Sequence, residues 1–239
     1  MRAEEVRGIL DFVGYFTVLW SGGKDSTAAL LWVLDNVKHS SWNILYVEVT
    51  GNTHPACTDY VLRIAKRLRV SDRLVVARTK DFFELAGKWG PPLLFAYRWC
   101  LYQLKRPAFM KAHKVVVTGA RRSDSRVRAR ILPAMVFKLT KQVTVNPLLD
   151  WTTDMVIDYL SERGVELNPC YKAYGHSGNC MFCPYADSKH IALTMSDPAW
   201  RSRILSMLED NRGRMMKGAL GRSVYERWMK WARQPPITS

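Results

Sequence analysis

Apolar and polar positions alternate along the first two thirds of the chain with two different periods. Short runs rich in β-branched and aromatic residues predict strands at 15–20, 43–49, 73–77, 114–118 and 142–145. Between these runs, apolar residues recur at helical spacing and predict helices at 26–37, 56–68, 81–88 and about 93–112. The strands are apolar throughout, which is typical of a parallel sheet buried on both faces. The pattern therefore predicts an α/β fold, a parallel twisted sheet with helices on both faces.

The pattern changes after the last predicted strand. A further helix is expected at 151–163, with Thr152 or Thr153 as its N-cap and Gly164 just beyond its end. Residues 167–185 are rich in Gly, Pro, Asn and Cys and predict an irregular loop. From 196 to 233 the chain is helical and basic, with nine Lys or Arg against four acids. We expect a main domain at 1–195 and a basic helical extension at 196–239, in which 234–239 form a frayed end.

The charge of the chain indicates a polyanionic partner or a phosphate-rich ligand. The formal net charge is +15, from 36 Lys and Arg against 21 Asp and Glu. Residues 85–123 contain eight Lys or Arg and no acid, a concentration that favours a functional face. A basic surface without a partner is the alternative.

The composition predicts a cytoplasmic protein that does not enter a membrane. The sequence contains no uninterrupted apolar span of about 18 residues, the length that a membrane helix needs. The first ten residues, MRAEEVRGIL, carry acids and do not resemble a signal peptide. Five cysteines in 239 residues are too few for a disulfide scaffold, so a clustered pair is expected to serve metal binding or catalysis.

Residues 21–26, SGGKDS, join the first predicted strand to the first predicted helix. Glycines let the backbone approach a ligand closely, and the helix that follows offers unpaired N–H groups and a positive dipole end. Lys24 adds a cation, Ser21 and Ser26 add hydroxyls, and Asp25 is a candidate ligand for Mg²⁺. These features predict a pyrophosphate site, and the alternative is an ordinary glycine turn. The spacing is not that of the Walker loop.

Six segments resemble signatures of one enzyme family. SGGKDS resembles the loop of the PP-loop ATP pyrophosphatases, which split ATP between the α and β phosphates and transfer AMP. In the order of the chain, 47–61, 98–107, 118–129 and the pair 146–160 and 168–184 resemble segments of the phosphoadenosine phosphosulfate (PAPS) reductase branch. The resemblance runs from about Tyr15 to Pro184 and implies the adenine nucleotide alpha hydrolase-like fold of that superfamily.

The resemblance also implies which residues hold the nucleotide. The pyrophosphate ligands would be Ser21, Gly22, Gly23, Lys24, Asp25 and Ser26, and Thr50 and Gly51 would lie beside the nucleoside. The remaining phosphate or sulfate oxygens would be bound by Gly119, Arg121, Ser125 and Arg128. Lys24, Asp25 and Arg121 would be catalytic. Arg122 and Arg126 fall outside the motif, and a solvated basic loop is the alternative for this whole segment.

The cysteines depart from the pattern of a PAPS reductase. The thiol-dependent reductases carry a Glu-Cys-Gly-Ile-His type tail that this sequence lacks, and the full SGGKDS favours ATP as the nucleotide. Cys180 and Cys183 form a CxxC, which suits a metal or cluster. Cys100 lies where sulfonucleotide reductases have a Cys-Cys pair of cluster ligands, and Cys170 is the candidate for a fourth ligand.

Three interpretations of the cysteines stay open. A [4Fe–4S] cluster held by three cysteines would resemble the PP-loop tRNA thiolases. A structural Zn²⁺ site would use all four cysteines, or His176 in place of one, and a redox dithiol at the CxxC is the third possibility. Cys57 is expected to be a small buried residue.

These features lead to a primary hypothesis and two alternatives. The primary hypothesis is ATP-dependent sulfur transfer, in which ATP adenylylates an acceptor, pyrophosphate is released and sulfur displaces AMP. The acceptor would be tRNA, DNA or a small molecule, with a sulfur donor protein as a further partner. The first alternative is a PAPS or adenosine phosphosulfate (APS) reductase. The second is a nucleic-acid-binding iron–sulfur protein without turnover.

Overall fold

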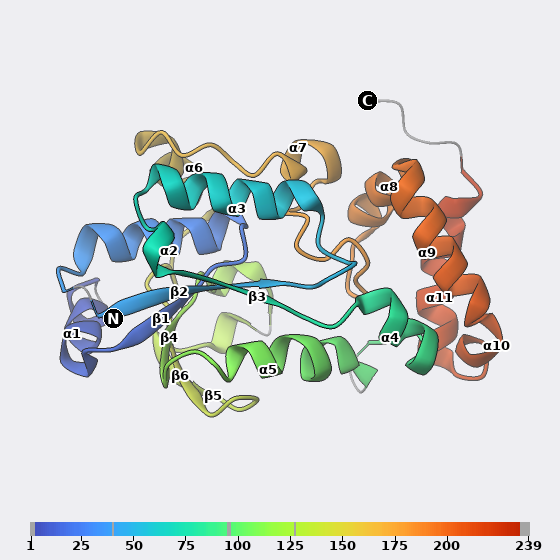
Figure 1. The fold of residues 1–239 in the computed structure, drawn as a ribbon, viewed down its shortest axis with the longest axis horizontal. Helices are drawn as coiled ribbons and strands as arrows, with labels where there is room; N and C mark the ends of the chain where they lie inside the picture. Colours follow the sequence, from blue (N-terminus) through green and yellow to red (C-terminus); the bar gives the residue numbers. More distant parts are fainter. Residues whose placement is uncertain (1–2, 40, 95–96, 127, 235–239) are drawn as a thin grey trace. The chain divides into compact units, whose positions relative to one another are not determined.

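The computed structural model describes residues 3–39, 41–94, 97–126 and 128–234 (Figure 1). The chain divides into two compact units. The first unit is Met1–Glu48, Thr58–Ala77 and Arg106–Asn168, and the second unit is Val49–Cys57, Arg78–Lys105 and Pro169–Ser239. The expected boundary after residue 195 falls inside helix α8 (Ser188–Ser196), and that division stays a prediction. Among the described residues, no helix has both the length and the apolar character needed to cross a bilayer.

A six-stranded, mostly parallel sheet forms the first unit, as predicted from the apolar runs. Its strands are β1 (Phe16–Leu19), β2 (Trp42–Glu48), β3 (Leu74–Arg78), β4 (Val115–Val117), β5 (Ala134–Phe137) and β6 (Gln142–Val145). They lie in the order β3-β2-β1-β4-β6-β5. β1 pairs in parallel with β2 and β4, and β4 with β6, which places Val18 opposite Ile44 and Val117. The chain leaves β1 toward one edge and β4 toward the other, so the topology reverses between these two strands.

The edge strand β5 is the element that the sequence did not predict. It runs antiparallel to β6, with Met135 opposite Thr144. Its four residues show no fully buried position, because one end is half-buried and Val136 and Phe137 are exposed. Its sequence, AMVF, is as apolar as those of the inner strands, so the exposure of Val136 and Phe137 reflects its position at the edge of the sheet.

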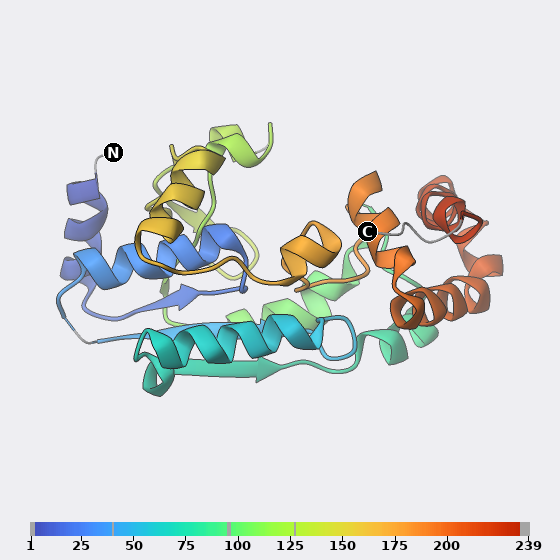
Figure 2. The ribbon, with the colours of Figure 1, turned by 90° about the horizontal axis from the view of Figure 1, so that it is seen from above.

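Helices cover both faces of this sheet, as expected. The helices are α1 (Ala3–Val13), α2 (Lys24–Asn36), α3 (Pro55–Arg67), α5 (Arg106–Phe109) and α6 (Thr153–Glu162). α2 and α6 pack against each other on one face, and α5 lies on the other (Figures 1 and 2). Thr152 is the N-cap of α6, because its hydroxyl accepts a hydrogen bond from the Met155 N–H at 3.2 Å. Gly164 follows the helix with a φ of +62°.

The helix expected at about 93–112 is shorter and starts later. Residues 95 and 96 lie outside the described residues, and the chain becomes helical as a π-helix over Cys100–Lys105 that leads into α5. Pro107 offers a physical reason for the wide turn, since it has no N–H to bond to the carbonyl of residue 103. Cys100 and Lys105 lie at the two ends of this π-helix and interact electrostatically.

The second unit is helical and has an aromatic core. Its helices are α4 (Phe82–Trp89), α7 (Cys170–Tyr174), α8, α9 (Pro198–Asp210), α10 (Arg212–Met215) and α11 (Ala219–Ala232). The Phe82 ring stacks on Trp99 with centroids 5.4 Å apart, and Phe182 stacks on Trp228 at 4.7 Å. The helical character expected for 196–233 is thus present, while 235–239 of the expected frayed end lie outside the described residues.

Candidate functional site

The SGGKDS loop folds tightly between β1 and α2. Gly22 has a φ of +74°, and Gly23 is the N-cap of α2, with no side chain to cap it. The Ser26 hydroxyl donates to the Gly23 carbonyl at 3.0 Å and accepts from the Ser21 N–H at 3.1 Å. These bonds fix the loop at the N-terminus of α2, the kind of helix end at which anions bind.

Asp25 joins the loop to the arginine segment that follows β4. The Lys24 ammonium lies 2.8 Å from both carboxylate oxygens of Asp25, and Arg121 Nε lies 2.9 Å from Oδ1. The contact with Arg121 is an ion pair rather than an aligned hydrogen bond, since the Nε–H has no acceptor in line. The carboxylate is therefore neutralised by two cations, one from each loop.

Arg121 is only 3% exposed and is held within the protein. Its Nη2 donates to Asp124 Oδ1 at 2.9 Å, and Nη1 lies 3.3 Å from the Trp151 carbonyl. A buried guanidinium with such partners positions its loop. Direct phosphate binding by Arg121 stays a prediction. The residue that sequence reasoning missed here is Asp124, which pairs with both Arg121 and Arg128.

The other predicted residues of this loop lie at its surface or against SGGKDS. Gly119 packs against the first turn of α2, where an added Cβ would overlap the Asp25 backbone and lie 2.7 Å from the Ser26 nitrogen. The Ser125 hydroxyl accepts from the Arg128 N–H at 3.2 Å, and the Arg128 side chain is 52% exposed. Arg128 is thus accessible to a ligand, and Gly119 brings the two loops together.

A cavity of about 440 Å³ lies beside this loop within the first unit. It covers β1, β4 and β6 near the reversal of strand order, and its lining includes Leu19, Thr118, Asn146 and Arg128. The Thr118 hydroxyl bonds to Asn146 at 2.6 Å, so much of the polar lining already has partners and the remaining wall is apolar. Such cavities at a topological switch point are the usual ligand sites of open α/β sheets.

Thr50 and Gly51 belong to the second unit, in the turn after β2. Gly51 has a φ of +82°, and an added Cβ would overlap the carboxylate of Asp81, which caps α4. The Thr50 N–H donates to the Thr79 hydroxyl at 3.2 Å, and the Thr50 carbonyl accepts from Phe82 N. These bonds fix the turn, and its contact with a nucleoside stays a prediction.

Asn52, in the same turn, holds the CxxC loop and was not identified from the sequence. Its amide group donates to the Phe182 carbonyl at 2.9 Å and accepts from the Phe182 N–H at 2.8 Å. Its backbone carbonyl accepts from Met181 N at 2.8 Å. Asn52 is 1% exposed, so these bonds are shielded from water. An asparagine after a TG turn carries no sequence signal for this role.

Lys105 interacts electrostatically with three thiols, those of Cys100, Cys180 and Cys183. Burial raises the pKa of Cys100 to about 11, and repulsion from Cys180 adds to the effect. Burial also raises the pKa of Cys183, and repulsion from Cys180 raises it further. The Lys105 ammonium lies 3.2 Å from Cys180 Sγ, and this thiol group raises the pKa of Lys105. Sequence reasoning counted Lys105 only as part of the basic segment.

The donor chemistry of these three thiols fits a metal or cluster, since thiolates need a positive partner and Lys105 supplies one charge. The described residues contain no group of three or more His, Cys, Asp or Glu side chains already arranged to hold a metal ion. Cys170 lies elsewhere in the second unit. Burial and the neighbouring Cys57 raise its pKa to about 12, and its Sγ faces Gly178.

His176 is held in a way that disfavours metal binding. Its Nδ1 accepts from the Gly178 N–H at 3.1 Å, so the proton of the neutral ring is assigned to the buried Nε2. Its ring stacks on His190, with centroids 3.6 Å apart. Burial and then repulsion from His190 lower the pKa of His176 to about 3, and burial lowers that of His190.

The histidine stack makes stability depend on pH. Both rings take up protons less readily in the folded protein than in the unfolded chain, where histidines have a pKa of about 6.5. We therefore expect the unfolding temperature to fall from about pH 7.5 to about pH 5, because protons bind preferentially to the unfolded chain. Thermal unfolding followed by circular dichroism measures this fall. His190→Gln should reduce it, and a variant of the exposed His113, His113→Gln, should not; equal slopes for the two variants would contradict the assignment.

The fold and the first loop define a PP-loop α/β protein with helices on both faces of its sheet. Residues 16–186 match the model of the phosphoadenosine phosphosulfate reductase domain family. This match covers more than half of the chain, which therefore belongs to that family. The family resemblance stated from the sequence motifs is confirmed. No curated protein sequence gives a significant match to the chain.

Several solved structures are similar to the chain. The crystal structure of PAPS reductase from Candida auris, in its phosphate complex, aligns with a TM-score of 0.50 and 21% identity, over 72% of this chain and 84% of that chain. FMN adenylyltransferase from Candida glabrata, with FMN and an ATP analog, gives 0.48 and 15%, over 72% and 60%. The U34-tRNA thiolase NcsA from Methanococcus maripaludis, with its [4Fe-4S] cluster, gives 0.46 and 12%, over 92% and 70%. At these identities the likeness concerns the fold alone.

Proposed function

We propose that this protein is an enzyme that uses ATP to activate an acceptor oxygen by adenylylation and then replaces that oxygen with sulfur. The observation that carries the proposal is the complete SGGKDS loop, with Lys24 and Asp25 at the uncapped start of α2. A dedicated lysine and a carboxylate beside an anion site suit the triphosphate of ATP with its Mg²⁺. The acceptor oxygen attacks the α phosphorus, the bond to the β phosphate breaks, and pyrophosphate leaves.

Each loop residue has a separate task in this step. The N–H groups of α2 bind the pyrophosphate, and their dipole stabilises the charge that develops on it. Lys24 would bind phosphate oxygens in place of Asp25 when ATP binds, and Asp25 would then be free to hold Mg²⁺, which would neutralise charge on the phosphates. Arg121 stays on Asp25 and Asp124 and keeps the two loops together, while the exposed Arg128 reaches the α phosphate or the sugar.

The thiols are assigned to the sulfur half of the reaction. Cys100, Cys180 and Cys183 would hold an iron–sulfur cluster, which supplies a site where inorganic sulfide can be carried to the acceptor. The Lys105 ammonium, 3.2 Å from Cys180 Sγ, places one positive charge beside the three sulfurs. Cys170 and His176 are not needed as ligands in this proposal, and Zn²⁺ at the same three thiols is the alternative. The sulfur then displaces AMP from the adenylylated acceptor.

The proposal predicts a large effect of one lysine. Lys24→Ala should lower pyrophosphate release from ATP by about 100-fold, because one cation at the leaving phosphate is lost. The assay supplies labelled ATP, Mg²⁺, sulfide and single-stranded or transfer RNA to anaerobically prepared protein, and scores pyrophosphate and thiolated product. Lys38→Ala, an exposed lysine beyond the far end of α2, serves as the control and should keep full activity.

The family match favours a second candidate, reduction of PAPS or APS to sulfite by a thiol. The same preparation distinguishes it. Sulfite formation from either sulfonucleotide, together with no pyrophosphate release from ATP, would replace the proposed activity by the reductase.

A further inference from the structure

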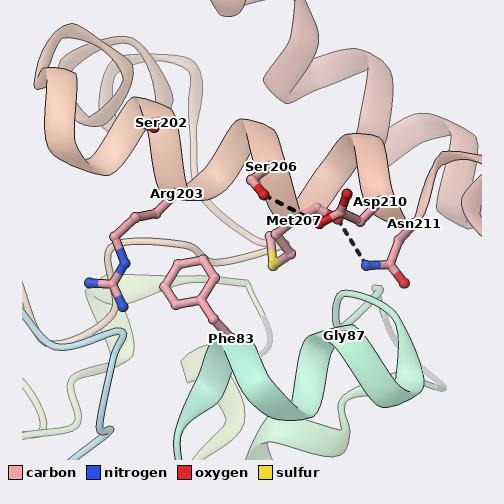
Figure 3. Close-up of a pocket in the computed structure, with 8 residues that line it drawn as sticks. All are labelled: Phe83, Gly87, Ser202, Arg203, Ser206, Met207, Asp210 and Asn211. Carbon is pink, nitrogen blue, oxygen red and sulfur yellow. Dashed lines mark hydrogen bonds between the residues drawn. The ribbon is translucent and has the colours of Figure 1, made fainter.

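A groove between α4 and α9 lies within the second unit, apart from the cysteines (Figure 3). It encloses about 440 Å³, a volume in the range of small-ligand sites. The residues that matter most in its lining are Phe83, Gly87, Arg203, Ser206, Met207 and Asp210. None of them has a role in the proposed chemistry of ATP or sulfur.

At one end of the groove an arginine lies over two aromatic rings. The Arg203 guanidinium lies 4.6 Å from the centre of the Phe83 ring and 5.3 Å from that of Trp200. Figure 3 shows Arg203 and Phe83 projecting from the two helices toward each other. Gly87 leaves the adjacent floor open, since an added Cβ there would meet no atom within 4 Å. Planar guanidinium and aromatic groups of this kind are where unstacked nucleobases bind.

The other end of the groove presents acceptors. Asp210 accepts from the Ser206 hydroxyl at 3.2 Å, and the Asn211 amide donates to the Met207 carbonyl at 2.9 Å (Figure 3). The side chain of Asp210 is exposed, so its second carboxylate oxygen can accept from a ligand. A carboxylate selects a partner that offers N–H groups and repels one that offers carbonyl oxygens.

Cations surround the groove. Arg214 Nη1 donates to the Lys88 carbonyl at 3.1 Å, which holds the Arg214 side chain at the end of α4. Arg212 is exposed nearby along the chain, as is Lys88, whose ammonium pairs with Glu84 at 2.7 Å. The second unit as a whole has 16 Lys or Arg against seven acids. Positive charge at the rim with a carboxylate inside favours a phosphate backbone carrying bases over an acidic peptide.

We propose that this groove binds one nucleotide of a single-stranded nucleic acid, with the base stacked at Arg203 and Phe83 and its edge donating to Asp210. This inference rests on the proposed function and names where a nucleic-acid acceptor is held. Guanine is the preferred base, because its N1–H and N2 amino group are adjacent donors. Uracil offers a single N–H between two carbonyl oxygens, which the carboxylate repels. The phosphates on either side contact Lys88 and Arg212.

The test measures binding of labelled single-stranded RNA of about 10 nucleotides by fluorescence anisotropy, without ATP, at about 0.1 M salt. The RNAs differ at one central position, which is guanine, inosine or uracil. Arg203→Ala should weaken binding of the guanine RNA about 10-fold, the loss expected for one stacked base. Asp210→Asn should abolish the preference for guanine over inosine and uracil. Arg222→Ala, an exposed arginine on α11, is the matched control and should change affinity less than twofold.

Three results would overturn the inference: equal affinity of the wild-type protein for the three RNAs, equal losses for Arg203→Ala and Arg222→Ala, or equally strong binding of a polyglutamate peptide. Unfolding temperatures are recorded for each variant, and Asp210→Asn, a nearly isosteric change, gives a result even if Arg203→Ala destabilises the unit. The assay is independent of the proposed function. Lys24→Ala should bind RNA normally, so a protein that binds guanine RNA here but releases no pyrophosphate would refute only the enzyme activity.

Discussion

Gly119→Ala is expected to abolish pyrophosphate release and to lower the free energy of unfolding by about 3 kcal/mol. The new methyl group would occupy the space of the Asp25 backbone and lie 2.7 Å from the Ser26 nitrogen. These are backbone atoms of the first turn of α2, so they cannot move aside as the end of a flexible side chain can. Either the arginine loop or the SGGKDS loop must shift, and both hold Asp25.

Gly8→Ala is the matched control for this substitution. Gly8 lies in α1 and has no atom within 4 Å of an added Cβ. Alanine there should raise stability by about 0.5–1 kcal/mol, since it is the better helix former. Urea unfolding and the pyrophosphate assay are run on both variants. Full activity of Gly119→Ala would show that the two loops need not touch for catalysis.

Asn52→Ala is expected to lower the free energy of unfolding by about 3 kcal/mol and to reduce the metal content of anaerobically prepared protein. The substitution removes two buried hydrogen bonds and leaves the N–H and carbonyl of Phe182 without their partner. Phe182 lies between Cys180 and Cys183, so its backbone sets the distance between the two thiols. Urea unfolding measures the first effect, and iron, sulfide and zinc analysis measures the second.

Two further variants sharpen this result. Asn52→Asp keeps an acceptor for the Phe182 N–H but loses the donor to its carbonyl, and we expect a loss at least as large because two acceptors then face each other. Asn36→Ala removes an amide that donates to the Trp32 carbonyl of its own helix, and should cost less than about 1 kcal/mol. If Asn52→Ala kept both wild-type stability and metal content, the turn would not organise the thiols.

The inner part of the sheet follows from the sequence because its signal is local. Residues 16–19 and 42–48 are nearly all buried, and burial on both faces produces the continuous apolar runs that predict β1 and β2. β5 was missed although its four residues, AMVF, are also apolar; they come from an edge strand in which Val136 and Phe137 are exposed. The π-helix over Cys100–Lys105 was likewise missed, since apolar periodicity does not distinguish it from the α-helix that was expected.

The part of the candidate site that consists of consecutive residues could be predicted from the sequence. SGGKDS is such a case, because glycines and a helix start define an anion site without help from elsewhere. The ion pair between Arg121 and Asp25 joins residues about 96 positions apart. The hydrogen bonds between Asn52 and Phe182 join residues 130 positions apart, and sequence spacing alone reveals neither contact. The same limit applies to Lys105, whose thiol partner is 75 residues away.

The chain passes between the two units five times, and this determines how the protein can be divided. Neither unit is an uninterrupted stretch of sequence, so neither can be moved as a cassette by a single recombination or isolated by a single protease cut. A truncation after residue 195 would remove Trp228, on which Phe182 of the CxxC loop stacks. The basic helices therefore cannot be removed without loss of packing around the CxxC loop. Trp228, near the end of the chain, stacks on the loop that carries Cys180 and Cys183.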